Sequence, residues 1–333
     1  AVIANFIGTT GASMLLIRPF IRLNRERIQP YHIVFFIFIV SNVGGCLTPV
    51  GDPPLFLGFL KGVPFFWTVE HLWGKWLLGV GALLVIFYFF DRKNYSGAFK
   101  VNLFSGKVTL YGTHNLLWLA IIIGSVFLDP GIIPWLPHIS YHGDKISFVR
   151  EAVMLSVAFF AYRTADKVCL EGNGFNFEPI KEVAFLFAGI FATMMPALQL
   201  ISLFAQNHAG DVSQHTLYWA SGFLSSVLDN APTYLNFLSA GLGKVGLDIS
   251  NKADVMKFAG SAETMEVLMA VSVASVFFGA CTYIGNAPNF MVKSIAEQAG
   301  IKMPSFAGYV LRYTVPFLLP VLALIWLVFF VIL

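Results

Sequence analysis

Long apolar runs separated by short polar loops recur along the whole chain of 333 residues. Several of these runs approach the ~20 residues that a helix needs to cross the ~30 Å hydrocarbon core of a bilayer. The pattern therefore predicts an all-α, multi-pass (polytopic) membrane protein. The expected apolar segments cover residues 1–17, 31–66, 73–90, 114–128, 148–162, 183–205, 215–240, 258–299 and 306–333.

The second apolar run, residues 31–66, contains a stretch that no continuous helix can follow. Residues 45–54 read G-C-L-T-P-V-G-D-P-P, in which Pro49, Pro53 and Pro54 lack amide donors and the glycines weaken the remaining helix. The stretch also carries Asp52, a carboxylate that a lipid-facing helix would not tolerate. We therefore predict that the crossing helix unwinds here, inside the membrane.

A second copy of this stretch occurs near the end of the chain. Residues 279–288 read G-A-C-T-Y-I-G-N-A-P and match the first copy at Gly, Thr, a β-branched residue, Gly and Pro, with Asn286 in place of Asp52. A polar breakpoint precedes each copy, N-F-I-G-T at 5–9 and D-N-A-P-T at 229–233. The pattern predicts two repeats, each with a re-entrant hairpin followed by a discontinuous transmembrane helix, as in many secondary transporters.

Composition places the whole chain in the membrane. Hydrophobic residues make up 57% of it and charged residues 12%, against about 25% in soluble proteins, and no polar stretch is long enough for a soluble domain. Lys and Arg gather in loops around 18–27, 92–107 and 163–181, which the positive-inside rule assigns to the cytoplasm. On this topology the first broken segment runs outward and the second runs inward, so the two repeats are inverted.

The predicted organisation divides the chain into four parts. Residues 1–66 form the first repeat of a transport part, and residues 67–182 form scaffold helices and loops. Residues 183–299 form the second repeat, and residues 300–333 form a final scaffold helix. Because the chain begins inside an apolar segment without an initiator Met, we expect that an N-terminal portion precedes it.

Other functional classes find little support in the sequence. It shows no nucleotide-binding loop, hydrolase triad or metal-ligand spacing, so we do not expect an enzyme. The net charge of +3 arises mostly in loops, which argues against a nucleic-acid partner. Cys46, Cys169 and Cys281 show no pairing pattern that would predict a disulfide framework.

The breaks concentrate oxygen atoms inside the membrane. Their side-chain oxygens come from Asn5, Thr48, Asn230 and Thr282. Together with freed carbonyls these suit Na⁺, while the N-termini of half-helices attract anions. Asp52 and Asp229 each add a carboxylate beside a break, where a proton and a cation can compete for it. Two alternatives stay open: the glycines and prolines only kink packed helices, or the aspartates cap half-helices.

Two further acidic residues lie at the start of the second broken segment. Glu263 and Glu266 share one helical face. They either line an external vestibule or belong to a solvated helix end beside Lys252, Asp254 and Lys257. The neighbouring charges favour the solvated helix end.

The motifs G-x-x-T-P-V-G-D-P-P, D-N-A-P-T and G-x-x-T-x-I-G-N-A-P-N resemble those of the ion transporter superfamily, most closely NhaD-type sodium/proton antiporters and citrate-transporter-like proteins. The resemblance covers nearly the whole chain. It implies an elevator-type homodimer, with a transport part that moves against a scaffold, in the bacterial inner membrane. By the same resemblance, the first ion site gathers Asn5, Thr9, Gly45, Thr48 and Asp52, and the second gathers Asp229, Asn230, Thr233, Thr282 and Asn286.

Three functions remain in view at this point. The leading hypothesis is a sodium/proton antiporter in which Na⁺ or Li⁺ competes with H⁺ at Asp52 and Asp229, without a resident cofactor. The runner-up is cation-coupled transport of citrate or another anion, such as a different carboxylate or arsenite. The third is a non-transporting membrane subunit, with a further membrane subunit supplying the N-terminal part.

Overall fold

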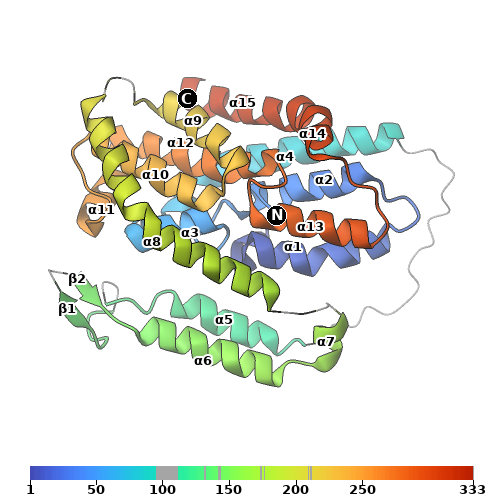
Figure 1. The fold of residues 1–333 in the computed structure, drawn as a ribbon, viewed down its shortest axis with the longest axis horizontal. Coiled ribbons are helices and arrows are strands. Elements are labelled where there is room, and N and C mark those ends of the chain that lie inside the picture. Colours follow the sequence, from blue (N-terminus) through green and yellow to red (C-terminus); the bar gives the residue numbers. More distant parts are fainter. Residues whose placement is uncertain are drawn as a thin grey trace. The chain divides into compact units, whose positions relative to one another are not determined.

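The computed structural model describes residues 1–94, 112–130, 133–141, 144–172, 175, 177–208, 210 and 212–332. The described chain is mostly helical (Figure 1). It divides into two compact units, one formed by residues Ala1–Phe99 and Glu182–Leu333 and the other by residues Lys100–Lys181.

The first unit contains both predicted breaks. Its helices are α1 (Ala4–Leu23), α2 (Pro30–Ile39), α3 (Pro53–Lys61), α4 (Trp67–Asn94), most of α8 (Glu178–Asn207), α9 (Gln214–Val227), α10 (Asn230–Lys244), α11 (Lys252–Gly260), α12 (Ala262–Phe278), α13 (Ala287–Gln298), α14 (Phe306–Tyr309) and α15 (Leu319–Leu327). Short 3-10 turns follow α2 and α12, namely η1 (Val43–Gly45) and η2 (Gly279–Cys281). Two π-helical stretches, η3 (Val310–Leu318) and η4 (Val328–Ile332), flank α15.

Among the described residues, three helical segments are long and apolar enough to cross a membrane: Trp67–Asn94, Ala262–Cys281 and Phe306–Ile332. In the second segment 89% of the most apolar 18-residue stretch is buried, against 28% of the corresponding stretch in each of the other two segments. α12 therefore belongs to the interior of the first unit. The other two segments present apolar side chains such as Leu77, Phe89 and Leu311 on faces that lipid can cover.

Helices from distant parts of the sequence pack together in the first unit (Figure 1). α12 packs against α9 and α10. α3, which follows the first break, packs against α10, and α13, which follows the second break, packs against α1 and α2. Each half of the chain thus supplies the packing partner for the helix that follows the break in the other half.

The second unit is a helical pair with a small hairpin. α5 (Asn115–Ser125) packs against α6 (Val149–Thr164), with α7 (Lys167–Gly172) following. Strands β1 (Ile139–Tyr141) and β2 (Asp144–Ile146) pair antiparallel, with Ile139 opposite Ile146. The prediction of an all-α protein is wrong for this hairpin, where β-branched and aromatic residues favour the extended conformation.

Two predicted segment boundaries are also wrong. The sequence predicts a loop from Arg18, but α1 continues to Leu23 because Pro19 removes a single amide donor while Ile17 and Ile21 stay buried on neighbouring turns. The sequence also predicts one segment from residue 258 onward. Instead α11 ends at Gly260, since Ser261 is extended (φ −87°, ψ 130°), and α12 starts a new helix.

Candidate ion site between two helix breaks

The two breaks have the same local structure. In the first, α2 is followed by η1, an extended Asp52 (φ −146°, ψ 144°) and then α3. In the second, α12 is followed by η2, an extended Asn286 (φ −154°, ψ 137°) and then α13. Both following helices carry proline within their first two positions, where its fixed φ favours helix initiation. The predicted unwinding at both stretches is confirmed.

Paired glycines allow each break to close on itself. A Cβ atom on Gly51 would overlap the carbonyl oxygen of Gly45. A Cβ atom on Gly285 would lie 2.6 Å from the carbonyl oxygen of Gly279, closer than real contacts allow. The matching glycines therefore meet the same requirement in both copies, a close approach of two backbone segments.

Asn5 completes the hydrogen bonding of the first break. Its Nδ2 donates to the carbonyl of Gly44 (2.7 Å), and its Oδ1 accepts from the amide of Leu47 (2.8 Å). The Thr48 hydroxyl donates back to the Asn5 carbonyl (2.6 Å). α1 is interrupted at Gly8 (φ 78°, ψ 157°), as the N-F-I-G-T motif predicts. The side chain thus supplies partners that lipid could not offer to an unwound helix.

In the second break this role belongs to Asn289. Its Nδ2 donates to the carbonyls of Gly279 (2.7 Å) and Thr282 (2.8 Å). The Thr282 hydroxyl donates to the carbonyl of Ser226 and accepts from the amide of Gly285 (3.1 Å). The two breaks share a backbone design, but the asparagine that completes the bonding comes from a different position in each.

The carboxylate of Asp52 lies where four segments meet. Asp52 is 1% exposed. Its Oδ1 accepts from the Thr9 hydroxyl (2.6 Å) and from Asn286 Nδ2 (3.2 Å), and its Oδ2 accepts from Asn230 Nδ2 (2.7 Å). Although Asp52 holds the N-cap position of α3, its side chain makes no capping hydrogen bond. The capping alternative for this residue is therefore wrong, and the side chain instead joins both halves of the chain.

The surroundings of this carboxylate contain neutral donors. No ion pair joins Asp52 to a basic side chain in the part of the chain that the structure describes. Oδ1 of Asn230, which is fully buried, has no hydrogen-bond partner among the described residues. A buried charge without a counter-ion is costly, whereas a carboxylate with nearby amide and hydroxyl oxygens can accommodate a proton or a cation.

Asp229 has a different role in the geometry. It is half-buried, and its Oδ1 accepts from the Ala231 amide (2.9 Å) at the start of α10. The Thr233 hydroxyl donates to the Asp229 carbonyl (2.9 Å). The capping alternative is confirmed for this aspartate, and proton coupling by Asp229 stays a prediction.

The structure thus redistributes the ten predicted site residues. Direct hydrogen bonds connect Thr9, Asn230 and Asn286 to Asp52, although the resemblance divides these residues between two sites. The others serve the breaks themselves: Asn5, Gly45 and Thr48 the first, Thr282 the second, and Asp229 and Thr233 the start of α10.

Two buried asparagines connect the breaks: Asn42, which the sequence interpretation missed, and Asn289, which ends the quoted motif G-x-x-T-x-I-G-N-A-P-N but received no site role. Asn42 Nδ2 donates to the Ile37 carbonyl (2.9 Å) and to Asn289 Oδ1 (2.7 Å). Asn42 Oδ1 accepts from Asn286 Nδ2 (3.1 Å). The available signal for Asn42 was an uncharged amide at the end of an apolar run, shortly before the first motif.

We expect Asn289→Ala to destabilise the protein by about 2–4 kcal/mol, because it leaves the buried carbonyls of Gly279 and Thr282 without their donor. Thermal melting in detergent measures the effect. The control is Asn94→Ala, which removes an exposed amide donating to the Phe90 carbonyl (2.7 Å) and should change stability by at most about 0.5 kcal/mol. Equal melting of the two variants would contradict a structural role for Asn289.

Apolar spanning helices with two breaks around a buried carboxylate define a membrane transporter. Residues 1–330 match the family described as "Putative citrate transport", and the chain belongs to that family. No curated protein and no solved structure matches the chain. The family membership supports the citrate-transporter-like part of the predicted resemblance and argues for a transporter instead of an enzyme; the NhaD-type relationship stays a prediction.

Proposed function

We propose that the chain is a secondary transporter that moves citrate or a related carboxylate-bearing anion together with a cation, and that Asp52 binds the cation. The observation that carries the proposal is the burial of Asp52 among three neutral hydrogen-bond donors from α1, α10 and the second break. The family description supplies the class of anion.

Oxygen atoms around Asp52 support the cation site. The Thr9 hydroxyl and the side chain of Asn230, whose Oδ1 is free, both contact the carboxylate, and the three groups belong to three different segments. Carboxylate, hydroxyl and amide oxygens are the ligands that coupling cations use where transporter helices unwind. Neutralisation of the buried carboxylate by Na⁺, Li⁺ or H⁺ would also remove the electrostatic cost of its burial.

Helix N-termini support an anion next to this cation. α3, α10 and α13 begin at or beside residues that contact Asp52, and each N-terminus carries a partial charge of roughly +0.5. However, Pro53 and Pro54 remove the first two amides of α3, and Asp229 already accepts from Ala231. We therefore infer that the anion is held by the helix dipoles and the bound cation more than by amides of these two helices.

Exchange of Na⁺ or Li⁺ for H⁺ is the second candidate function. It is favoured by the pair of carboxylates, Asp52 and Asp229, that lie at neighbouring helix starts. In this mechanism both aspartates couple proton and cation movement. A cation site at Asp52 is common to both candidates, so they differ in whether an anion moves.

The transport cycle we propose is of the elevator type. The α9–α10 pair and the start of α1 act as the two re-entrant hairpins, and the α2–α3 and α12–α13 segments act as discontinuous helices of inverted repeats. Two observations support this assignment. The two breaks have the same backbone conformation, and the helix after each break packs on a helix from the other half of the chain, α3 on α10 and α13 on α1. We place the protein in the bacterial inner membrane as a homodimer.

Proteoliposomes containing the full chain test the two functions together. We expect radiolabelled citrate to enter faster when an inward Na⁺ or H⁺ gradient is imposed. The reference is choline buffer with the same pH on both sides of the vesicle membrane. A pH dye inside the same vesicles detects exchange. Na⁺-driven alkalinisation or acidification without citrate uptake would favour the antiporter, and absence of both signals would favour a non-transporting subunit.

A further inference from the structure

An apolar groove is lined by residues of α1, α2 and α4, and none of these lining residues contacts Asp52. Its volume is about 380 Å³. Most of its lining is aliphatic or aromatic and comes from three helices, with Phe20 and Leu23 of α1, Phe36 and Ile39 of α2, and Leu84 and Phe87 of α4. A groove of this size and composition suits a hydrocarbon chain.

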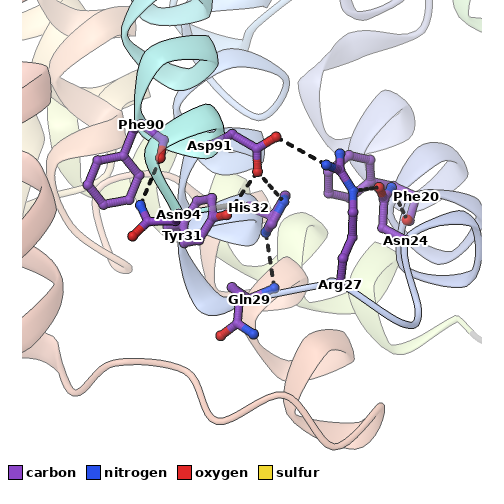
Figure 2. Close-up of polar contacts among 9 residues, drawn as sticks. All are labelled: Phe20, Asn24, Arg27, Gln29, Tyr31, His32, Phe90, Asp91 and Asn94. Carbon is purple, nitrogen blue, oxygen red and sulfur yellow. Dashed lines mark hydrogen bonds and ion pairs between the residues drawn. The ribbon is translucent and has the colours of Figure 1, made fainter. Parts of the chain in front are cut away.

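His32 is the polar residue in the lining, and Gln29 and Asp91 lie against its two ring nitrogens (Figure 2). Its Nδ1 accepts from the Gln29 amide (3.0 Å), and its Nε2 lies 3.0 Å from Asp91 Oδ1. The Tyr31 hydroxyl donates to the same carboxylate oxygen (2.8 Å). The contacts of Tyr31 and His32 with Asp91 hold the end of α4 against the start of α2. Because both nitrogens of His32 face Gln29 and Asp91, the histidine contributes the face of its ring to the groove, which stays apolar.

Basic side chains follow the groove-lining residues at the ends of α1 and α4, the ends that lie next to Leu23 and His32. Arg22 and Arg25 are exposed at the end of α1 and in the following loop, and Arg92 and Lys93 are exposed at the end of α4. Arg27 is different, because it pairs with Asp91 (3.1 Å) and helps to join α4 to this loop (Figure 2). Glu26 is the acidic residue in this loop, so the four exposed basic side chains leave the rim with a net positive charge beside a hydrocarbon-lined body.

We propose that this groove binds an anionic phospholipid, with an acyl chain along α2 and the phosphate at the basic rim. Every bilayer lipid offers a hydrocarbon chain, so the groove alone does not select one. The rim does select, since Lys and Arg near the membrane surface attract anionic lipids, and basic pockets between helices bind their headgroups. Charge complementarity thus favours an anionic lipid over a zwitterionic lipid or an apolar helix.

Native mass spectrometry of the detergent-purified full chain, titrated with phosphatidylglycerol or phosphatidylcholine of identical acyl chains, tests the proposal. We expect phosphatidylglycerol to bind at least tenfold more tightly. The triple variant R22Q/R25Q/K93Q should lose this preference. The control variant K252Q/K257Q/K302Q also removes three exposed positive charges, but away from the groove, and should keep it. Equal affinity for the two lipids, or equal loss in both variants, would overturn the proposal.

A cysteine in the groove separates lipid from protein as the occupant. In L84C, we expect phosphatidylglycerol to slow maleimide labelling at least fivefold, and phosphatidylcholine to slow it much less. The matched control is V85C on the exposed face of α4, where both lipids should act alike. If maleimide labelled L84C as slowly in lipid-free detergent as in phosphatidylglycerol, the protein itself would cover the groove, and the proposal would be overturned.

Discussion

Asp52→Asn is expected to lower cation-coupled transport by about 100-fold or more while leaving the protein folded. The substitution removes the negative charge at the meeting point of the two breaks and keeps the size of the side chain. The remaining ligands are neutral, and neutral ligands hold a desolvated cation too weakly to replace its hydration. Transport in proteoliposomes, and melting in Na⁺, Li⁺, K⁺ and citrate, measure the change.

The fold should survive because the hydrogen bonds around Asp52 can be rebuilt. An amide at this position keeps one oxygen for Thr9 and Asn286 and presents an N–H group to Asn230. Asn230 Oδ1 is free to accept it after rotation of the Asn230 amide. We therefore expect the ion-free melting temperature to change little, while the stabilisation that Na⁺ or Li⁺ confers on wild-type protein disappears.

Glu263→Gln is the matched control, because it makes the same carboxylate-to-amide change on an exposed residue in the first turn of α12. It should retain transport within about twofold. Asp229→Asn should preserve the cap of α10, since Asn is as good an N-cap as Asp, and so it tests proton coupling separately. Wild-type transport and ion-dependent melting in the Asp52→Asn variant would rule out a cation site at Asp52.

Gly51→Ala is expected to destabilise the protein by about 3 kcal/mol or more, through a mechanism unrelated to charge. Its new methyl group would overlap the Gly45 carbonyl, a backbone atom that cannot rotate away. Gly285→Ala should act in the same way at the second break, against the Gly279 carbonyl. Melting in detergent measures the loss, and low yield of folded protein would be a further sign of it.

Gly81→Ala in α4 is the control for both glycine variants. A Cβ atom there meets nothing within 4 Å. Because Ala favours a helix over Gly by about 1 kcal/mol, the melting temperature should stay the same or rise. If Gly51→Ala and Gly81→Ala melted alike, the close backbone approach at the first break would be refuted.

Local chemistry was sufficient to predict the positions of the breaks. A helix ends where prolines, which lack an amide donor, cluster with glycines, which lack a side chain. Residues 45–54 and 279–288 could therefore be identified as unwound stretches from their local sequence. The same reasoning placed the Gly8 and Asp229 breakpoints. Boundaries such as the end of α1 were less predictable, because burial of Ile21 outweighs the donor lost at Pro19.

The partners of the polar side chains required the packed structure. Asp52 and Asp229 both lie in sequences that favour capping, yet only Asp229 caps its helix through its side chain. Asp52 contacts Thr9, Asn230 and Asn286, which are separated from it by 43, 178 and 234 residues. Hydropathy and helix propensity describe neighbours along the chain, whereas a buried polar group must find its partner in space. The residue types at the breaks therefore predicted an ion site, and the packing of α3 on α10 and of α13 on α1 determined which side chains meet at Asp52.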